Sequence, residues 1–338
     1  MGAIRHGSEK EKAETKAQGS PQEANPRVVS AGIARPTKKE NRERTEHERF
    51  KPCSNSGRSY SSPFALTSLR AGPSMAQRVE FENMDPKTRT EATVEILAAR
   101  TRAMADLFPQ SQSTFERIAG GCVASCGADS MHNYACGIGS AGKVSEEELD
   151  ALEDFFRVRG SPISLLVTPP TDPSLISMLT KRGYVRGRSR RDWWRPTVGY
   201  EPHVGDEQVT VVPVVPGNTE NWARLAAQGF DEGRIGDILA MAQAQGAYPF
   251  LALYGKEHVG AALLTIYKDV GYLSTATTLD SHRGKGVHKA LIAERLKHAF
   301  EASCKTVFAT TDPKESISEK NLAYFGFMLL DEMWFVSR

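Results

Sequence analysis

The feature that most restricts the fold is a run of regular strand and helix patterns in the C-terminal part of the 338-residue chain. Two apolar segments, Phe250–Tyr254 and Val259–Tyr267, flank the short turn Gly255–His258, which predicts a β-hairpin. Tyr272–Leu279 predicts a third strand, and a helix is expected from Gly286 to about Ala302. A meander followed directly by a helix indicates an α/β or α+β fold, in which helices pack on a mostly antiparallel sheet.

Similar patterns continue on both sides of this run. On the helix from Gly286, the apolar residues Ile292, Leu296, Ala299 and Phe300 share one face, and we expect all four to be buried. Further strands are expected at Gly121–Cys126, Asn133–Ile138, Ile163–Val167, Arg188–Arg195, Val209–Val212, Thr306–Thr310 and Phe327–Val336. Further helices are expected at Thr88–Leu107, after a Ser145–Glu148 capping box, and at Leu175–Lys181, Thr219–Ala227 and Ser318–Phe325.

The turn between the third strand and its helix, Arg283–His288, is the clearest candidate binding site. Glycine lets a backbone approach a ligand closely, and the free amides of a helix N-terminus attract anions. Arg283, Lys285 and Lys289 add cationic side chains, so a diphosphate would fit. Taken alone, such a turn is equally typical of a plain connection with solvated charges. Its place after a meander, with no acidic residue about 20 residues on after a strand, disfavours a dinucleotide-binding fold.

Arg283-x-x-Gly286-x-His288 resembles the Q/R-x-x-G-x-G/A acetyl-CoA pyrophosphate motif of the GNAT superfamily of N-acetyltransferases. Ser318, Asn321 and Gly326-Phe327 resemble the Ser-x-x-Asn…Gly-Phe ending of many bacterial members. The resemblance covers roughly residues 208–338. Residues 75–196 look like a degenerate second copy without the motif, as in tandem-GNAT proteins. The resemblance implies two tandem domains, each a mixed, mostly antiparallel sheet flanked by helices.

The same resemblance implies a binding site for acetyl-CoA as co-substrate. Backbone amides of the turn would hold the pyrophosphate, the end of the preceding strand would pair with the pantetheine arm, and Asn321 would lie near the thiol. An amine would attack the thioester directly, in a reaction that depends on positioning and on oxyanion stabilisation. The residues expected to bind the cofactor are Thr277, Thr278, Leu279, Arg283, Gly284, Lys285, Gly286, Val287, His288 and Asn321.

Departures from the family pattern leave the acid–base residues unassigned. His288 stands where the motif has Gly or Ala; its ring either points away from the phosphates or donates to one. The strand Tyr272–Thr278 has no carboxylate, and Leu322 occupies the usual position of the tyrosine acid. The weak catalytic candidates are Asp280, His282 and Tyr324.

Composition divides the chain into four regions. Residues 1–74 have 14 Lys or Arg against 8 Asp or Glu and few large apolar residues, which predicts a disordered basic tail. Residues 75–196 and 208–338 are expected to fold as two domains, and 197–207 to link them. Met75 precedes sequence that looks folded, so a second hypothesis is that translation begins there.

Several kinds of site and location are disfavoured. No apolar run is long enough to span a membrane and no secretory signal is visible, so a cytoplasmic protein is expected. The odd, scattered set of cysteines argues against a disulfide framework. Cys122, Cys126, His132 and Cys136 fit no common zinc spacing, so no metal is expected.

The sequence therefore predicts an N-acetyltransferase that moves an acetyl group from acetyl-CoA to a small-molecule amine or a peptide. The alternative is a non-catalytic acyl-CoA-binding or interaction module. Nucleic-acid binding by the basic tail is disfavoured because its charges are mixed in sign and not interleaved with aromatic residues. Arg188, Arg190 and Arg191 could attract an acidic partner, although a solvated strand face explains them equally. The oligomeric state stays open.

Overall fold

The computed structural model describes residues 84–201, 208–313 and 316–338. All of these belong to one compact unit, Gly72–Arg338. The expected disordered tail of residues 1–74, the proposed start at Met75 and residues 202–207 of the linker lie outside the described residues.

The first half of the described chain runs through nine regular elements. Their order is α1 (Pro86–Leu107), β1 (Thr114–Ile118), β2 (Gly121–Ser125), β3 (Tyr134–Cys136), α2 (Glu146–Arg157), β4 (Ser164–Val167), α3 (Pro173–Lys181) and β5 (Val185–Pro196), with a 3-10 turn, Pro109–Ser111, after α1. The capping box at Ser145 and Glu148 is confirmed, because each residue's side chain accepts from the backbone amide of the other.

The second half repeats most of this pattern. Its elements are β6 (Val209–Pro213), α4 (Thr219–Ala227), α5 (Ile235–Gln243), β7 (Ala247–Tyr254), β8 (Glu257–Tyr267), β9 (Val270–Thr278), α6 (Val287–Glu301), β10 (Thr306–Thr311), α7 (Ser316–Tyr324) and β11 (Met328–Ser337). The meander, helix, strand, helix, strand order of β1 to β5 recurs from β7 to β11. Every strand and helix predicted from the sequence is present, while β1 and α5 were not predicted.

All eleven described strands form one sheet, in the order β1-β2-β3-β4-β11-β5-β10-β9-β8-β7-β6. Within it, β3 pairs with β4 and β9 with β10 in parallel, and the other neighbours pair antiparallel. This confirms the predicted mixed, mostly antiparallel sheet with flanking helices.

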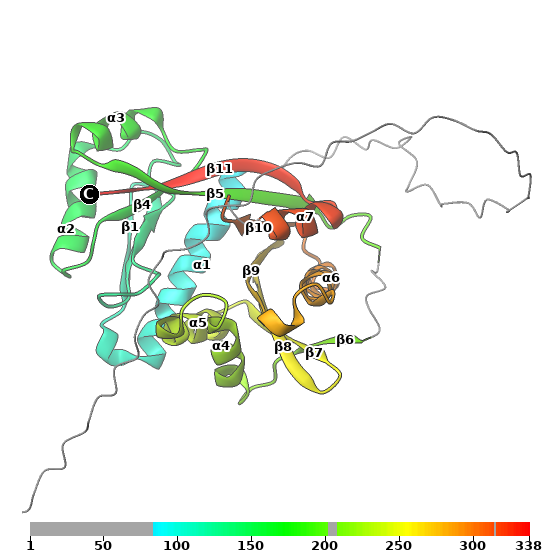
Figure 1. Ribbon diagram of the computed structural model, residues 1–338. Coiled ribbons are helices and arrows are strands. Elements are labelled where there is room, and N and C mark those ends of the chain that lie inside the picture. The colour runs from blue at the N-terminus through cyan, green and yellow to red at the C-terminus, as the bar shows by residue number, and fades with distance from the viewer. Residues whose placement is uncertain (1–83, 202–207, 314–315) are drawn as a thin grey trace, which may run out of the picture. The chain divides into compact units, whose positions relative to one another are not determined.

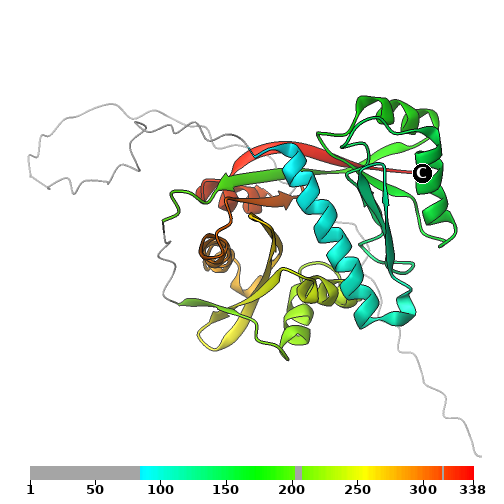
Figure 2. The ribbon, with the colours of Figure 1, turned by 180° about the vertical axis from the view of Figure 1, so that it is seen from behind.

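The two halves share this sheet by exchanging their last strands (Figure 1). β11 lies between β4 and β5 of the first half, and β5 lies between β11 and β10 of the second. Helix α1 also joins the halves, because its buried face packs on β2 while Ala103 and Met104 pack with Ala240 of α5 (Figure 2). The tandem arrangement is thus confirmed in part: the pattern repeats, within one continuous sheet.

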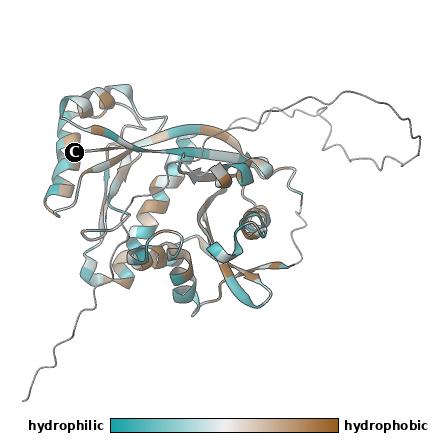
Figure 3. Ribbon diagram, viewed as in Figure 1, coloured by the Kyte–Doolittle hydropathy of each residue, from teal (hydrophilic) through white to brown (hydrophobic). Residues whose placement is uncertain are grey.

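Each half has its own apolar centre, visible where brown segments of the helices face the strands (Figure 3). In the first half, Leu149, Leu152 and Phe156 of α2 pack against β2 and β4. In the second, Leu291, Ile292 and Leu296 of α6 pack against β7, β8 and β9. These packed faces fix where each helix begins relative to the sheet.

The predicted buried face of α6 is correct for three of its four residues and wrong for Phe300. Ile292, Leu296 and Ala299 are buried as expected, but Phe300 is 49% exposed and stands beside Tyr200, with ring centroids 5.3 Å apart. Arg295, in contrast, is buried with 2% exposure, although charged residues are rarely buried in proteins. The buried face of α6 therefore includes one cation.

Candidate functional site

The N-terminus of α6 presents backbone amides with no side chain capping them. Gly286, the N-cap, has φ 77°, and Gly284 has φ 79°, both in the left-handed region that glycine adopts without strain. The first helical hydrogen bond runs from Ala290 N–H to Gly286 C=O, so the amides of Val287 and its two successors have no partner within the helix. There is no acidic residue in this first turn. The geometry is that of an anion site.

A groove of about 660 Å³ lies at this helix end. It brings together most of the residues that the sequence predicted for the cofactor. Those lining it are Thr277, Thr278, Arg283, Gly284, Gly286, Val287, His288 and Asn321.

Two of the predicted residues do not line this groove. The Leu279 amide donates to Val259 C=O at 2.9 Å, and its side chain packs with the apolar cluster of α4 and α5. The Lys285 ammonium lies 4.9 Å from the centroid of the Tyr254 ring. The Thr277 hydroxyl is also engaged, because it donates to Ala226 C=O at 2.8 Å. Thr277 can therefore contribute its backbone more readily than its side chain.

Strands β9 and β10 separate beside this groove. Their parallel pairing ends at Leu273 and Ala309, and a second hollow of about 300 Å³ continues between Ser274–Ala276 and Ala309–Asp312. The register of β9 against β8 shifts at this level, and Thr275 has φ 51°. A bulge with a left-handed non-glycine residue re-aims the backbone locally. The gap between the strands could hold an extended chain.

Arg295 fixes the backbone at the bulge. Its guanidinium donates to Leu291 C=O at 2.9 Å, to Leu263 C=O at 3.2 Å and to Ser274 C=O at 3.2 Å. Burial lowers the pKa of this guanidinium to about 9. The sequence analysis missed Arg295, because neither spacing nor residue type distinguishes it from a surface arginine.

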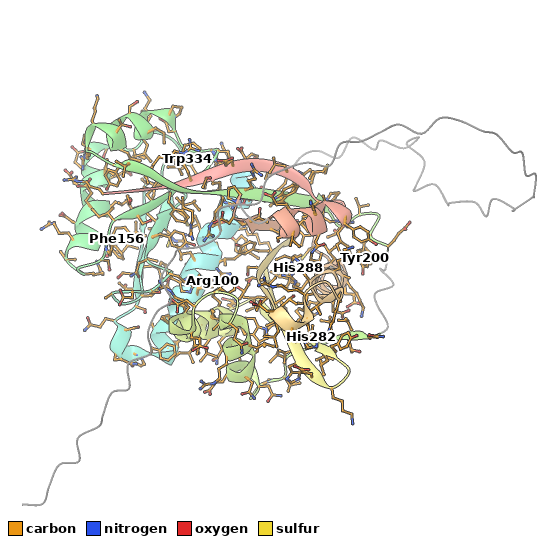
Figure 4. The ribbon with its side chains drawn as sticks, viewed as in Figure 1. Arg100, Phe156, Tyr200, His282, His288 and Trp334 are labelled. Atoms are coloured by element: carbon orange, nitrogen blue, oxygen red, sulfur yellow. The ribbon has the colours of Figure 1, made fainter. Side chains whose placement is uncertain are left out.

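His288, labelled in Figure 4, is among the residues that border both hollows. The Asn321 amide group is 3.0 Å from His288 Nδ1. Burial, and secondarily the positive charge of Arg295, lowers the pKa of His288 to about 4. The ring is therefore neutral near pH 7, and a plain surface histidine is not what stands at this motif position.

The three weak catalytic candidates are not brought together. The Asp280 carboxylate is 86% exposed and pairs with Arg283 at 2.8 Å. The His282 ring is buried beside Tyr254, with centroids 5.3 Å apart, and its Nδ1 is 3.0 Å from the Ser281 hydroxyl. Tyr324 is 58% exposed, with the Lys289 ammonium 4.2 Å from its ring centroid. Of these, His282 alone borders the groove at α6.

The described residues contain neither a metal-binding cluster nor a membrane-spanning helix. Within the described ranges, no group of three or more His, Cys, Asp or Glu side chains is placed to bind a metal ion. Among the described helices, none combines the length and the apolar composition needed to cross a bilayer. The expected cytoplasmic location stays a prediction.

Comparison with known proteins supports the resemblance seen in the sequence. Residues 219–327 match the family model described as the acetyltransferase (GNAT) family. A GCN5-related N-acetyltransferase from Kribbella flavida has a similar fold, with 16% identity, a TM-score of 0.54, and coverage of 71% of this chain and 95% of that one. A tandem GNAT protein from the clavulanic acid biosynthesis pathway shows 14% identity and a TM-score of 0.52, covering 74% and 95%. No curated protein matches the sequence.

Proposed function

Residues 219–327 match the model of the acetyltransferase (GNAT) family, and from this premise we propose that the chain transfers an acetyl group from acetyl-CoA to an amine. The observation that carries the proposal is the uncapped, acid-free N-terminus of α6, at the point where β9 and β10 separate. A nucleotide diphosphate and an extended thiol-bearing arm need these two features side by side.

The residues present fit such a co-substrate. The amides from Gly286 to Lys289 would bind the pyrophosphate, with Arg283 adding a charge from the rim. Nothing stands within 4 Å of a Cβ built on Gly284, so the space over this turn is open. The arm would follow β9 from Thr278 towards the bulge, and acetyl-CoA would supply the activated acetyl group there.

The chain's own contribution to the reaction is positioning. Arg295 holds the β9 bulge, so that backbone amides near Thr275 would be fixed where negative charge develops on the acyl oxygen. Asn321 and neutral His288 would border the thioester end without adding a charge. The amine nitrogen forms the new C–N bond as the C–S bond breaks, and the proton lost by the amine is taken up by the departing thiolate or by solvent.

The test uses the full chain and measures binding and turnover separately. We expect saturable acetyl-CoA binding in calorimetry, and release of coenzyme A thiol that requires an added amine. A panel of small-molecule amines and short peptides would be used as acceptors. Absence of acetyl-CoA binding to protein shown by circular dichroism to be folded would refute the proposal.

A second candidate is a module that binds acyl-CoA without catalysis. It is favoured by one observation: among the described residues of β9 there is no carboxylate, and Asp280 and Tyr324 do not border the groove. Tight acetyl-CoA binding with no amine-dependent thiol release across the panel would support this alternative over an enzyme.

A further inference from the structure

A further hollow, outside the cofactor groove, lies where the two halves meet. It has a volume of about 620 Å³ and is lined by α1, the β2–β3 connection, β5, β9, β11 and the α4–α5 connection. Arg100, Arg188, Arg190 and Tyr272 border both this cavity and the hollow between β9 and β10. The cavity therefore opens onto the place where an acyl group would be presented, and we call it the acceptor cavity.

Three arginines of the acceptor cavity are not neutralised. Arg100 is 7% exposed; it donates to the Ser274 hydroxyl at 3.3 Å, and its Nε has no hydrogen-bond partner among the described residues. Arg188 and Arg190 lie on the same face of β5, with guanidinium carbons 5.3 and 5.4 Å from the Phe335 ring centroid. No carboxylate of the described ranges lies within ion-pair distance of these three side chains.

Of the other charged groups that line the cavity, Arg89 and Arg234 lie beside carboxylates, and Asp231 adds one negative charge. Arg89 forms a buried ion pair with Asp192, and Arg234 donates to Asp129 C=O and lies 3.6 Å from Asp237. The Asp231 carboxylate accepts from the Gly233 amide at 2.9 Å.

Two further titratable groups, Asp312 and His132, bear on the charge in this region. Asp312, at the end of β10, raises the pKa of Arg188, against burial and the charge of Arg190, which lower it more. His132 is buried and its pKa is lowered to about 4 by burial and then by Arg100, so it adds no charge near pH 7. The net charge of the side chains that line the acceptor cavity is therefore positive.

Arg100 is a buried cation whose Nε has no partner, which is unfavourable, whereas Arg190 is half-buried and Arg188 is exposed. The guanidinium fork of each matches carboxylate and phosphate oxygens. On the basis of the proposed function, we propose that the acceptor is a small amine that also carries a carboxylate or a phosphate. Its anionic group binds Arg100, Arg188 and Arg190, while Tyr272 and Phe335 contact the rest of the molecule.

This arrangement also suggests how the amine could lose its proton although β9 has no carboxylate to act as a general base. Nearby positive charges favour the neutral form of an amine over the ammonium form. An acceptor held through its anion next to three guanidinium groups would lose its ammonium proton to solvent more easily. The free nitrogen lone pair could then attack the thioester with no carboxylate on β9 to remove the proton.

The test compares matched amines on the full chain saturated with acetyl-CoA. Phenylalanine is paired with phenethylamine, which lacks the carboxylate, and phosphoethanolamine with ethanolamine, which lacks the phosphate. By calorimetry, we expect the anionic member of at least one pair to bind on the order of 10 to 100-fold more tightly, as charge-assisted hydrogen bonds predict. The pair that responds identifies the anion.

Variants locate the effect. Arg190→Gln should lower the protein's affinity for the anionic amine about 10-fold or more. Its affinity for the matched amine without the anion should stay unchanged. Arg186→Gln is the matched control, because Arg186 is on the same strand but does not line the cavity. Arg100→Gln serves as a second variant, with folding checked by circular dichroism.

The proposal is overturned if neither anion binds, if both pairs bind equally, or if Arg190→Gln and Arg186→Gln behave alike. Acetyl-CoA binding is measured on the same samples. Its absence would refute the proposed function, whereas its presence together with equal binding of the paired amines would refute only the anionic acceptor.

Discussion

The α2 and α6 helices occupy equivalent places in the two halves, yet their N-termini are opposite in chemistry. Both follow a glycine-containing connection with left-handed residues, at Gly137 and Gly139 in one case and at Gly284 and Gly286 in the other. At α2 the Ser145 hydroxyl caps the helix and three glutamates fill the first turn. At α6 no side chain caps the helix, and the first turn has no acid.

The difference shows that glycine alone does not make an anion site. At α2 the Glu148 amide is already bonded to the Ser145 hydroxyl, and a phosphate there would meet Glu146, Glu147 and Glu148. The α6 amides are open and have Arg283 and Lys289 beside them. The same backbone pattern is thus closed by a side-chain cap in the first half and open to a ligand in the second. The following predictions are ordered from the largest expected effect to the smallest.

Gly286→Glu should make the α6 turn resemble the α2 turn. A carboxylate placed among the open amides would repel a diphosphate and compete for those amides, so acetyl-CoA affinity should fall by about 100-fold or more. Calorimetry on the full chain measures this. Gly183→Glu is the control, because Gly183 has φ 84° in the first half and a similar backbone strain, but lies away from the groove. Equal loss in both variants would show that strain rather than charge is responsible.

The buried face of α6 includes Arg295, whereas the buried face of α2 is wholly apolar. The buried residues of α2 are Leu149, Leu152, Phe155 and Phe156. Arg295→Met removes the donor to two strand carbonyls, at Leu263 and Ser274. We expect the free energy of unfolding, measured with urea, to fall by about 1–3 kcal/mol, with a lower turnover number as the bulge loosens. Arg224→Met, on the exposed face of α4, is the control. Unchanged turnover in Arg295→Met would remove the positioning role from Arg295.

One histidine in each half, His132 or His288, has its pKa lowered to about 4, mainly by burial. Between that pH and about 6.5 the unfolded chain binds more protons than the folded one, so the free energy of unfolding should rise with pH in this window. For either histidine the full effect is at most about 3 kcal/mol.

Denaturation at pH 4.5, 5.5 and 6.5 tests this titration. His288→Asn and His132→Asn should each flatten the pH dependence, but only His288→Asn should change acetyl-CoA affinity. A slope that is identical in the wild type and in both variants would contradict the prediction.

Ser145→Ala removes the cap at α2. The Glu148 amide loses its acceptor, and stability should fall by about 1 kcal/mol, with no change in acetyl-CoA affinity. Thermal unfolding and calorimetry on the same preparation measure the two quantities. A loss of acetyl-CoA binding beyond experimental error would mean that the two helix ends are not independent.

The element order was predictable where local periodicity and turn chemistry agree, as in the β7–β8 hairpin and the capped helix α2. β1 was missed because Thr114–Ile118 includes Glu116 and Arg117 and lacks a clear apolar alternation. α5 was missed because it has no side-chain cap. Its Asp237 bonds to the Ser130 hydroxyl and the Met131 amide, contacts made across more than a hundred residues.

The candidate site, like the fold, has one part that the sequence could predict and another that it could not. The α6 turn could be predicted because glycines, cations and a helix start stand together in a few residues. For Arg188 and Arg190 the sequence left two interpretations open, an acidic partner and a solvated strand face. The roles of Arg100 and Arg295 could not be predicted, because each depends on which distant strand or helix faces the guanidinium. A charged residue in a helix or strand is typical of a solvated surface, and tertiary packing alone distinguishes the buried ones.

The exchange of β5 and β11 has a consequence for biosynthesis. β5 has no strand neighbour until β10 and β11 have left the ribosome, and β4 lacks one neighbour until then. The first half is thus translated early but finished late, and it exposes open strand edges in the meantime. Premature termination after residue 327 would remove β11, and we expect the damage to reach the half that was translated first.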